Sequence, residues 1–200
     1  ATTVTFAGSA NITVLDKRTV ALTNSNATIC QGQGAFAKFD IVGNGTFTIT
    51  YNVNSTSFSF TATQANSPVT RAIPANLLNV GANNITITSV TNSIPGNATL
   101  CPIDMSAATD VITVRPTPSA GLTFNPTSIC EGSPVAVNFS TSSTDNIKVD
   151  YIISNNGVLT NRSLTYKNSD SPVDNVVVNG PFSVTVTNAQ YDAAPVCANT

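Results

Sequence analysis

The chain has 200 residues, of which only 9% are charged, with a net charge of −2 and no histidine. Its eight basic residues are scattered singly apart from Lys17-Arg18, so no basic patch can neutralise phosphates, which argues against nucleic-acid binding. Without histidine, Ser-His-Asp and Cys-His catalysis are excluded and the usual imidazole metal ligands are missing. No apolar run approaches the roughly 20 residues of a membrane-spanning helix. We therefore expect a protein that is not an enzyme and that has no membrane span in this segment.

Residues 1–25 give the first sign that the chain is repetitive. They match residues 100–125, with Ile12 and Val14 in the positions of Ile112 and Val114. Self-similarity at a fixed period is the sequence signature of repeat architectures. Residues 1–25 are therefore predicted to be the closing strand and linker of a preceding repeat.

Residues 26–118 are predicted to form the first full repeat, which opens on Ile29-Cys30-Gln31-Gly32. This phrase recurs as Ile129-Cys130-Glu131-Gly132, and 130 − 30 gives a period of 100 residues. Apolar and polar residues alternate along the repeat, which predicts strands with one buried face. The positions predicted to face the core are Ala35, Ala37, Phe39, Phe47, Ile49, Tyr51, Val53, Ile85 and Ile87, before a closing strand over 111–114.

Two other features of this repeat stand apart. Phe58 and Phe60 have no clear equivalent in the second repeat, so exposed contact surface and ordinary core remain alternatives. The residues that follow the closing strand are predicted to form an extended joint between domains, because two prolines stiffen them and deny them ladder donors. These joint residues are Arg115, Pro116, Thr117 and Pro118.

Residues 119–200 are predicted to form a second repeat that lacks its closing strand. Its expected core positions echo the first repeat: Val135, Val137, Phe139, Ile147, Val149, Tyr151, Ile153, Val184 and Val186. About seven short alternating strands per unit, separated by turns, are typical of a two-sheet sandwich. We therefore predict an all-β fold of tandem immunoglobulin-like β-sandwich repeats of about 100 residues.

Each repeat carries two cysteines, Cys30 with Cys101 and Cys130 with Cys197. Four cysteines allow three connectivities. The repeat favours Cys30–Cys101 and Cys130–Cys197, because each unit then closes its own loop; free buried thiols are the alternative. Paired cysteines in a β chain of low charge indicate an oxidising compartment, so we expect an extracellular protein.

Five acids of the second repeat could approach one another in the fold: Asp145, Asp150, Asp170, Asp174 and Asp192. Clustered carboxylates bind calcium. The chain has no D-x-D-x-D-G loop, however, and the first repeat has no counterpart cluster. We therefore expect no cofactor, with the five acids as solvated turn residues. A calcium site is the alternative.

A resemblance to a known family rests on four features of the sequence. They are the Ile-Cys-x-Gly phrase with its alternating strand over 129–139, the late strand over 182–187, the cysteine after that strand, and Val-x-Val followed by proline in 111–116. The chain resembles the immunoglobulin-like or PKD-like repeats of Bacteroidota surface proteins, including gliding-motility adhesins of the SprB type. It departs from many of these units in having Tyr51 and Tyr151 where they carry tryptophan. The resemblance implies type IX secretion, attachment at the bacterial cell surface and long arrays, and it transfers no catalytic residues.

Three functional hypotheses follow. The leading one is a structural repeat segment of an extracellular filament or stalk-like surface adhesin, for adhesion or gliding motility, whose partners are neighbouring repeats. The second is a pilin-like subunit that exchanges the strand Asn11, Ile12, Thr13 and Val14 into a neighbouring copy of the chain. The third is a carbohydrate- or protein-binding module with a surface polysaccharide as its partner.

Overall fold

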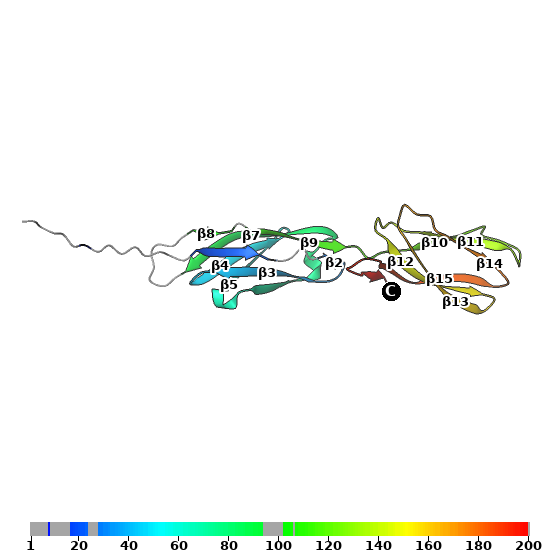
Figure 1. Cartoon of the computed structure of the whole chain (residues 1–200), viewed down its shortest axis with the longest axis horizontal. Coiled ribbons are helices and arrows are strands. Elements are labelled where there is room, and N and C mark those ends of the chain that lie inside the picture. The colour runs from blue at the N-terminus through cyan, green and yellow to red at the C-terminus, as the bar shows by residue number, and fades with distance from the viewer. Residues whose placement is uncertain (1–7, 9–16, 24–27, 94–101, 106, 200) are drawn as a thin grey trace, which may run out of the picture. The chain divides into compact units, whose positions relative to one another are not determined.

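The computed structural model describes residues 8, 17–23, 28–93, 102–105 and 107–199. These residues form sixteen strands in four sheets and two short 3-10 helices, with no α-helix among them (Figure 1). The 3-10 helices are η1 (Gln64–Asn66) and η2 (Ala75–Leu77). The all-β fold predicted from the alternating sequence pattern is confirmed.

The first repeat contains two sheets. One has the strand order β6-β3-β1-β8, and the other has the order β2-β9-β7-β4-β5. The bounds are β1 (Arg18–Leu22), β2 (Thr28–Cys30), β3 (Ala35–Val42), β4 (Thr46–Val53), β5 (Thr56–Ala62), β6 (Val69–Ile73), β7 (Gly81–Ser93), β8 (Ile103–Asp104) and β9 (Thr109–Arg115). The short strand β2 runs parallel to the closing strand β9, with Cys30 opposite Arg115.

The second repeat also contains two sheets, with the orders β10-β11-β14 and β13-β12-β15-β16. The bounds are β10 (Gly121–Asn125), β11 (Pro134–Ser140), β12 (Ile147–Asn155), β13 (Val158–Tyr166), β14 (Val173–Val177), β15 (Phe182–Tyr191) and β16 (Ala198–Asn199). One sheet of three strands facing one of four is an immunoglobulin-like sandwich arrangement. The residues between the two sheets form a single hydrophobic core.

The 100-residue period extends from the sequence to the hydrogen-bond register. Leu22 lies opposite Phe39 in the β1–β3 pair, and Leu122 lies opposite Phe139 in the β10–β11 pair. The β4–β7 register shifts between Thr50 and Tyr51, and the β12–β15 register shifts one period later, between Asp150 and Tyr151. Such a shift is a conserved kind of local irregularity that increases twist. The two repeats therefore share a fold down to its irregularities.

The same kind of hydrogen bond holds both register shifts in place. Thr88 Oγ1 donates to the Thr50 carbonyl oxygen at 3.2 Å, and Thr187 Oγ1 donates to the Asp150 carbonyl oxygen at 3.0 Å. A ladder that shifts leaves backbone carbonyls without their regular partners. The hydroxyls of Thr88 and Thr187 supply a donor at these positions.

The predicted core positions of β3, β4, β11 and β12 are confirmed as buried. In the first repeat the ring centroids of Phe39 and Tyr51 lie 4.9 Å apart, and in the second those of Phe139 and Tyr151 lie 4.7 Å apart. Each pair joins strands of two different sheets, so it packs the sandwich together. Aromatic pairs at these distances stabilise a core beyond the area they bury.

Phe58 and Phe60 belong to the edge of this core. Phe58 stacks on Tyr51 with a centroid distance of 5.4 Å, and Phe60 meets Phe39 edge-on at 5.0 Å. Both side chains are half-buried. The outer face of Phe60 is covered by Arg71, whose Cζ lies 4.4 Å from the ring centroid. Phe58 and Phe60 are thus partly core residues and partly exposed surface, so each of the two alternatives holds in part.

The repeat boundary near residue 25 differs from the prediction in one respect. Arg18–Leu22 forms β1, which pairs with β3 inside a sheet of the first repeat. The assignment of the residues before it to a preceding repeat stays a prediction, because 1–7 and 9–16 lie outside the described residues. At the other end, Ala198–Asn199 pairs with β15 as the short strand β16.

Truncation of Phe139 tests the packing of the second core. Phe139 is 3% exposed, so we expect Phe139→Ala to lower the free energy of unfolding by about 3–5 kcal/mol. The matched control is Leu159→Ala on the exposed face of β13, where the side chain is 68% exposed and the expected change is within about 0.5 kcal/mol. Urea unfolding of both variants measures the difference. Equal losses would show that Phe139 is not a core residue.

Candidate functional site

The structure contains a disulfide between Cys30 and Cys197, with a Cα–Cα distance of 5.4 Å and a sequence separation of 167 residues. The predicted pairs Cys30–Cys101 and Cys130–Cys197 are therefore wrong. A disulfide requires Cα atoms within about 4.4–6.8 Å, and the tertiary fold, not membership of one repeat, brings this pair together. Cys130 is an exposed free thiol, and Cys101 lies outside the described residues.

This disulfide connects the start of one repeat to the end of the next. Cys30 is the last residue of β2 and packs against the core of the second repeat, while Cys197 is itself buried in that core. The chain divides into two compact units, and residues 26–35, 73–83 and 111–200 belong to the same one. The region around the disulfide therefore lies within a single unit. We call the disulfide, Arg115, Asp145 and Tyr191 the joint cluster.

Arg115 forms the polar part of the joint cluster. Its Nη1 donates to the carbonyl oxygens of Ala193 at 3.1 Å and Pro195 at 3.4 Å. Its Nη2 forms an ion pair with Asp145, and its Cζ lies 4.2 Å from the ring centroid of Tyr191. A planar guanidinium can make all of these contacts at once, whereas a lysine ammonium cannot. One side chain thus contacts two separate segments of the second repeat, one at Asp145 and the other over 191–195.

Backbone hydrogen bonds complete the joint cluster. Gln31 N donates to the Arg115 carbonyl oxygen at 2.8 Å, and Thr117 N donates to Gln31 Oε1 at 3.2 Å. On the other side of the disulfide, Tyr191 N donates to the Cys197 carbonyl oxygen at 3.1 Å. Backbone groups that are paired in this way help to keep a segment in one position. Both cysteines are therefore held in place by their neighbours as well as by the covalent bond.

The predicted linker runs through the same region. Residues 116–120 are irregular backbone between β9 and β10, and Pro118 is buried. Thr141 Oγ1 donates to the Ser119 carbonyl oxygen at 2.8 Å, which ties the stretch to the second repeat. The hollow beside it has a volume of about 210 Å³, below the roughly 300 Å³ at which small-molecule sites begin. This hollow is therefore smaller than an ordinary small-molecule site.

A second polar group lies on the face of the second repeat. Tyr151 donates its hydroxyl to Asp174 Oδ2 at 2.8 Å, and Arg162 forms an ion pair with the same carboxylate. The pKa of the Tyr151 phenol is raised to about 12, first by burial and then by the hydrogen bond to Asp174 and the charge of that carboxylate, while Arg162 opposes the shift. In the first repeat burial also raises the pKa of Tyr51, against the charge of Arg71. Both phenols stay protonated near neutral pH and provide no general base.

The five acids proposed as a calcium cluster are dispersed. Asp145 pairs with Arg115, Asp174 pairs with Arg162, and Asp150 accepts from Asn188 at 3.2 Å. Asp170 Oδ2 accepts a hydrogen bond from Lys167 N at 3.0 Å within a turn. Within the part of the chain that the structure describes, no group of three or more His, Cys, Asp or Glu residues could hold a metal ion.

Comparisons with known proteins give fold-level likenesses only. No protein-family model and no curated protein matches the chain. Similar solved structures include CBD12 from CALX1.2, with 9% identity and a TM-score of 0.37 over 89% of this chain and 83% of that one. The calcium binding domain CBD12 of CALX1.1 gives 9% identity and a TM-score of 0.37 over 88% and 82%.

A third similar structure comes from a study of host cell surface retention of a 1.5-MDa bacterial ice-binding adhesin. It has 12% identity and a TM-score of 0.47 and covers 94% of this chain and 62% of that chain. At these identities and TM-scores, the likenesses carry no argument about family or ligand. Of the described residues, none belongs to a helix long and apolar enough to cross a membrane.

The site residues predicted from the sequence are thus only partly brought together. Cys30, Cys197 and Arg115 meet in the joint cluster, whereas Cys130 lies apart as a free thiol. The exchange strand Asn11, Ile12, Thr13 and Val14 lies outside the described residues and stays a prediction. Sequence reasoning missed Asp145 and Tyr191 as partners of Arg115, because nothing in their spacing links them.

Substitutions in the joint cluster separate the roles of its contacts. Arg115→Ala removes two hydrogen bonds, an ion pair and a ring contact, so we expect a loss of about 1–3 kcal/mol in the free energy of unfolding. Asp145→Asn removes only the ion pair with a carboxylate that is 58% exposed, so the expected loss is at most about 1 kcal/mol. Denaturant unfolding under oxidising conditions measures both. An equal loss in the two variants would show that the ion pair dominates.

Tyr151 predicts a specific alkaline response. Its folded pKa of about 12 lies above the ordinary value of 10.0, so the unfolded chain loses this proton first as the pH rises. The folding stability that this group contributes is therefore complete below pH 10 and is lost progressively as the pH approaches 12. A rapid ultraviolet titration of the native chain minus that of Tyr151→Phe should show one phenol ionising near pH 12. A difference spectrum centred near pH 10 would contradict this assignment.

Proposed function

We propose that this chain is a load-bearing segment of an extracellular filament or stalk, in which tandem immunoglobulin-like repeats are fixed to one another by disulfides. The observation that carries the proposal is the Cys30–Cys197 bond. A bond within one repeat would only stabilise that repeat. A bond from the start of one repeat to the end of the next also removes freedom between them.

The connectivity of this bond determines where tension would travel. Force applied to the two ends of the chain reaches Cys30, crosses the disulfide to Cys197 and bypasses the 167-residue separation between them. Most of both sandwiches is thereby shielded from unfolding under load. Arg115 and its carbonyl partners add non-covalent resistance at the same place. These are properties that a stalk needs and that a soluble binding module does not.

The chemistry of the chain supports an extracellular location. Disulfides persist in oxidising environments and are rare in the cytosol. The sequence resemblance to Bacteroidota surface repeats favours the bacterial cell surface, with gliding motility and type IX secretion as the finer parts of the proposal. The partners would be neighbouring repeats, of the same polypeptide or of other copies.

Single-molecule pulling tests the load-bearing role. With the disulfide intact, unfolding between the two chain ends should add almost no length, because only the residues outside Cys30 and Cys197 can extend. In Cys30→Ser, the 167-residue stretch is released and should add roughly 550–600 Å of contour length, at about 3.3–3.6 Å per residue less the 5.4 Å that separates the two Cα atoms in the folded chain. Cys130→Ser is the matched control and should behave like the native chain.

Two results would contradict the proposal. One is an oxidised chain that extends as far as the Cys30→Ser variant. The other comes from thiol alkylation of the native protein during isolation, without reductant. If the protein is in an oxidising compartment, Cys30 and Cys197 should stay unlabelled. Full labelling of both would show that the bond does not exist in the native protein.

A further inference from the structure

Once Cys30 is bonded to Cys197, two of the four cysteines, Cys101 and Cys130, remain to be explained. Cys130 occupies the place of Cys30 one period later, and Cys101 occupies the place of Cys197 in the first repeat. In the sequence, Cys30 and Cys130 stand near the start of their repeats, and Cys101 and Cys197 stand near the end. The bond therefore joins the start cysteine of one repeat to the end cysteine of the following one.

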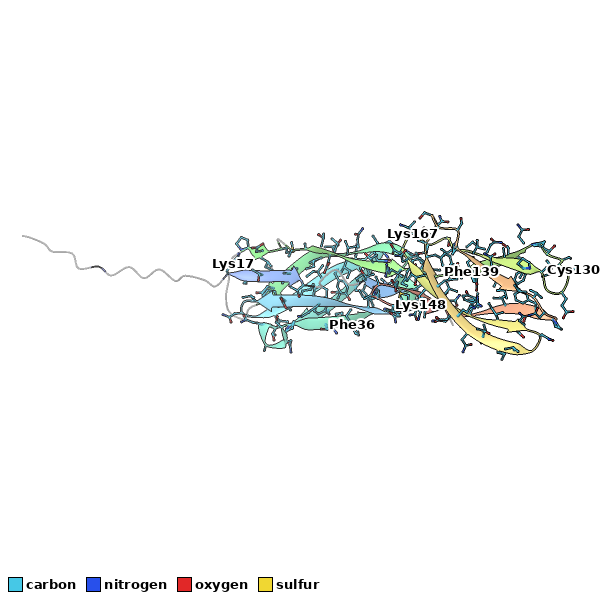
Figure 2. All side chains as sticks on the ribbon, turned by 45° about the vertical axis from the view of Figure 1, so that its right-hand side comes forward. Lys17, Phe36, Cys130, Phe139, Lys148 and Lys167 are labelled. Carbon is cyan, nitrogen blue, oxygen red and sulfur yellow. A yellow bond between two sulfur atoms is a disulfide. The ribbon has the colours of Figure 1, made fainter. Side chains whose placement is uncertain are left out.

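Cys30 and Cys130 are presented by the same backbone turn. Gln33 N donates to the Cys30 carbonyl oxygen at 3.1 Å, and Ser133 N donates to the Cys130 carbonyl oxygen at 3.1 Å. The glycine two residues after each cysteine is left-handed, with φ of 83° at Gly32 and 81° at Gly132. Their chemical states differ: Cys30 is bonded to Cys197, whereas Cys130 is an exposed thiol (Figure 2).

The surroundings of Cys130 give an independent indication that a partner belongs there. In the first repeat, Ile29 lies opposite Val114 in the parallel β2–β9 pair. In the second repeat, residues 128–130 are not part of a strand. Ile129 instead lines an open groove of about 400 Å³ whose other apolar side chains are Phe124, Val178 and Phe182. The position that pairs with a strand in the first repeat therefore borders an open groove in the second.

We propose that Cys130 is a crosslinking site whose partner is the end cysteine of a following repeat. This inference rests on the proposed function as an array of repeats. The following repeat belongs either to the same polypeptide or to a second copy of this chain, in which the end cysteine of the first repeat is Cys101. By the same rule, Cys101 bonds the start cysteine of a preceding repeat.

Formation of the bond requires a disulfide oxidant, either an oxidised thiol–disulfide oxidoreductase outside the cytoplasm or oxidised glutathione in the test tube. The Cys130 thiolate attacks one sulfur of the oxidant and releases the other as a thiolate, which gives a mixed disulfide. The thiolate of the end cysteine then attacks Cys130 Sγ and releases the second thiolate of the oxidant. Two thiols lose two protons and two electrons, and the oxidant is reduced to two thiols.

The consequence is a series of overlapping covalent loops. A start cysteine one period after Cys130 falls at about position 230, which is about 33 residues beyond Cys197. Tension can then pass from one disulfide to the next through this short stretch, while about 200 residues of sequence lie between the same two start cysteines. Such an array could hardly lengthen even if its repeats unfolded. A single intra-repeat disulfide in each unit would not have this effect.

The test uses two copies of the chain in one polypeptide. Because residues 1–25 match 100–125, the second copy continues the 100-residue period across the join. Two substitutions, Cys101→Ser in the first copy and Cys130→Ser in the second, leave the first-copy Cys130 and the second-copy Cys101 as the pair expected to bond. After refolding with oxidised glutathione, a non-reducing peptide map should contain that linked pair besides Cys30–Cys197 from each copy.

The matched control carries the reverse substitutions, so that Cys101 remains in the first copy and Cys130 in the second. These two residues should stay reactive thiols, because neither has a following or preceding repeat to bond. Oxidation of the single 200-residue chain at high concentration tests whether the following repeat can come from a second copy. Oligomers linked through Cys130–Cys101 would show that separate copies can form the bond. We expect a Cys130–Cys101 bond in most of the tandem protein and in less than a tenth of the control.

Several outcomes would overturn the proposal. They are a free first-copy Cys130 in the tandem protein, equal bonding in the tandem protein and its control, or dimers joined through Cys130–Cys130. None of these changes the pulling behaviour of the single chain, which depends on Cys30–Cys197 alone. The failure of this inference is thus separable from failure of the load-bearing function.

Discussion

The burial of alternating side chains between two sheets is the constraint on which each repeat depends. With only 9% charged residues the chain has few ion pairs, and the apolar face of its strands supplies most of the driving force for folding. The Phe39–Tyr51 and Phe139–Tyr151 contacts sit at the centre of this arrangement in their respective repeats. A domain of about 100 residues buries roughly two-thirds of its unfolded surface, so its core is adequate but not large. Added covalent links therefore have a substantial effect on stability.

The disulfide lies within the compact unit that combines residues 26–35, 73–83 and 111–200. Cys30 contacts the core of the second repeat from the end of β2, and Arg115 lies opposite it in register on β9. Cys30 reaches the segment after β15 through the disulfide, and Arg115 reaches it through two carbonyl oxygens. Arg115 also contacts Asp145 before β12 and the ring of Tyr191 at the end of β15. The core and the joint cluster thus depend on different kinds of contact. The core is held by many apolar contacts, whereas the joint cluster is held by a few side chains.

The remaining polar groups are consistent with a structural role. Tyr151, Asp174 and Arg162 form a hydrogen-bonded group on one face of the second sandwich, with the phenol held protonated. The first repeat has Tyr51, Phe60 and Arg71 in the corresponding region, where the arginine covers a ring instead of pairing with a carboxylate. The two faces differ in chemistry although their backbones share one register. Variation of this kind is expected where the fold is fixed by the core and the surface is free to change.

The sequence by itself determined the period, the strand class and the buried face of β3, β4, β11 and β12, whereas Val184 and Val186 of β15, also predicted to be core residues, are half-buried. A period-two pattern that is repeated 100 residues later leaves little choice about which side chains face the core, and Phe39, Phe139, Tyr51 and Tyr151 are buried as the pattern requires. It also marked Arg115, Pro116, Thr117 and Pro118 as the joint. Only the tertiary structure decided which cysteines meet and that Arg115 contacts Asp145 and Tyr191. The physical reason is that burial is a local property that recurs along each strand, whereas a disulfide depends on the distance between two Cα atoms. That distance is set by how elements 167 residues apart pack together, which no local pattern encodes.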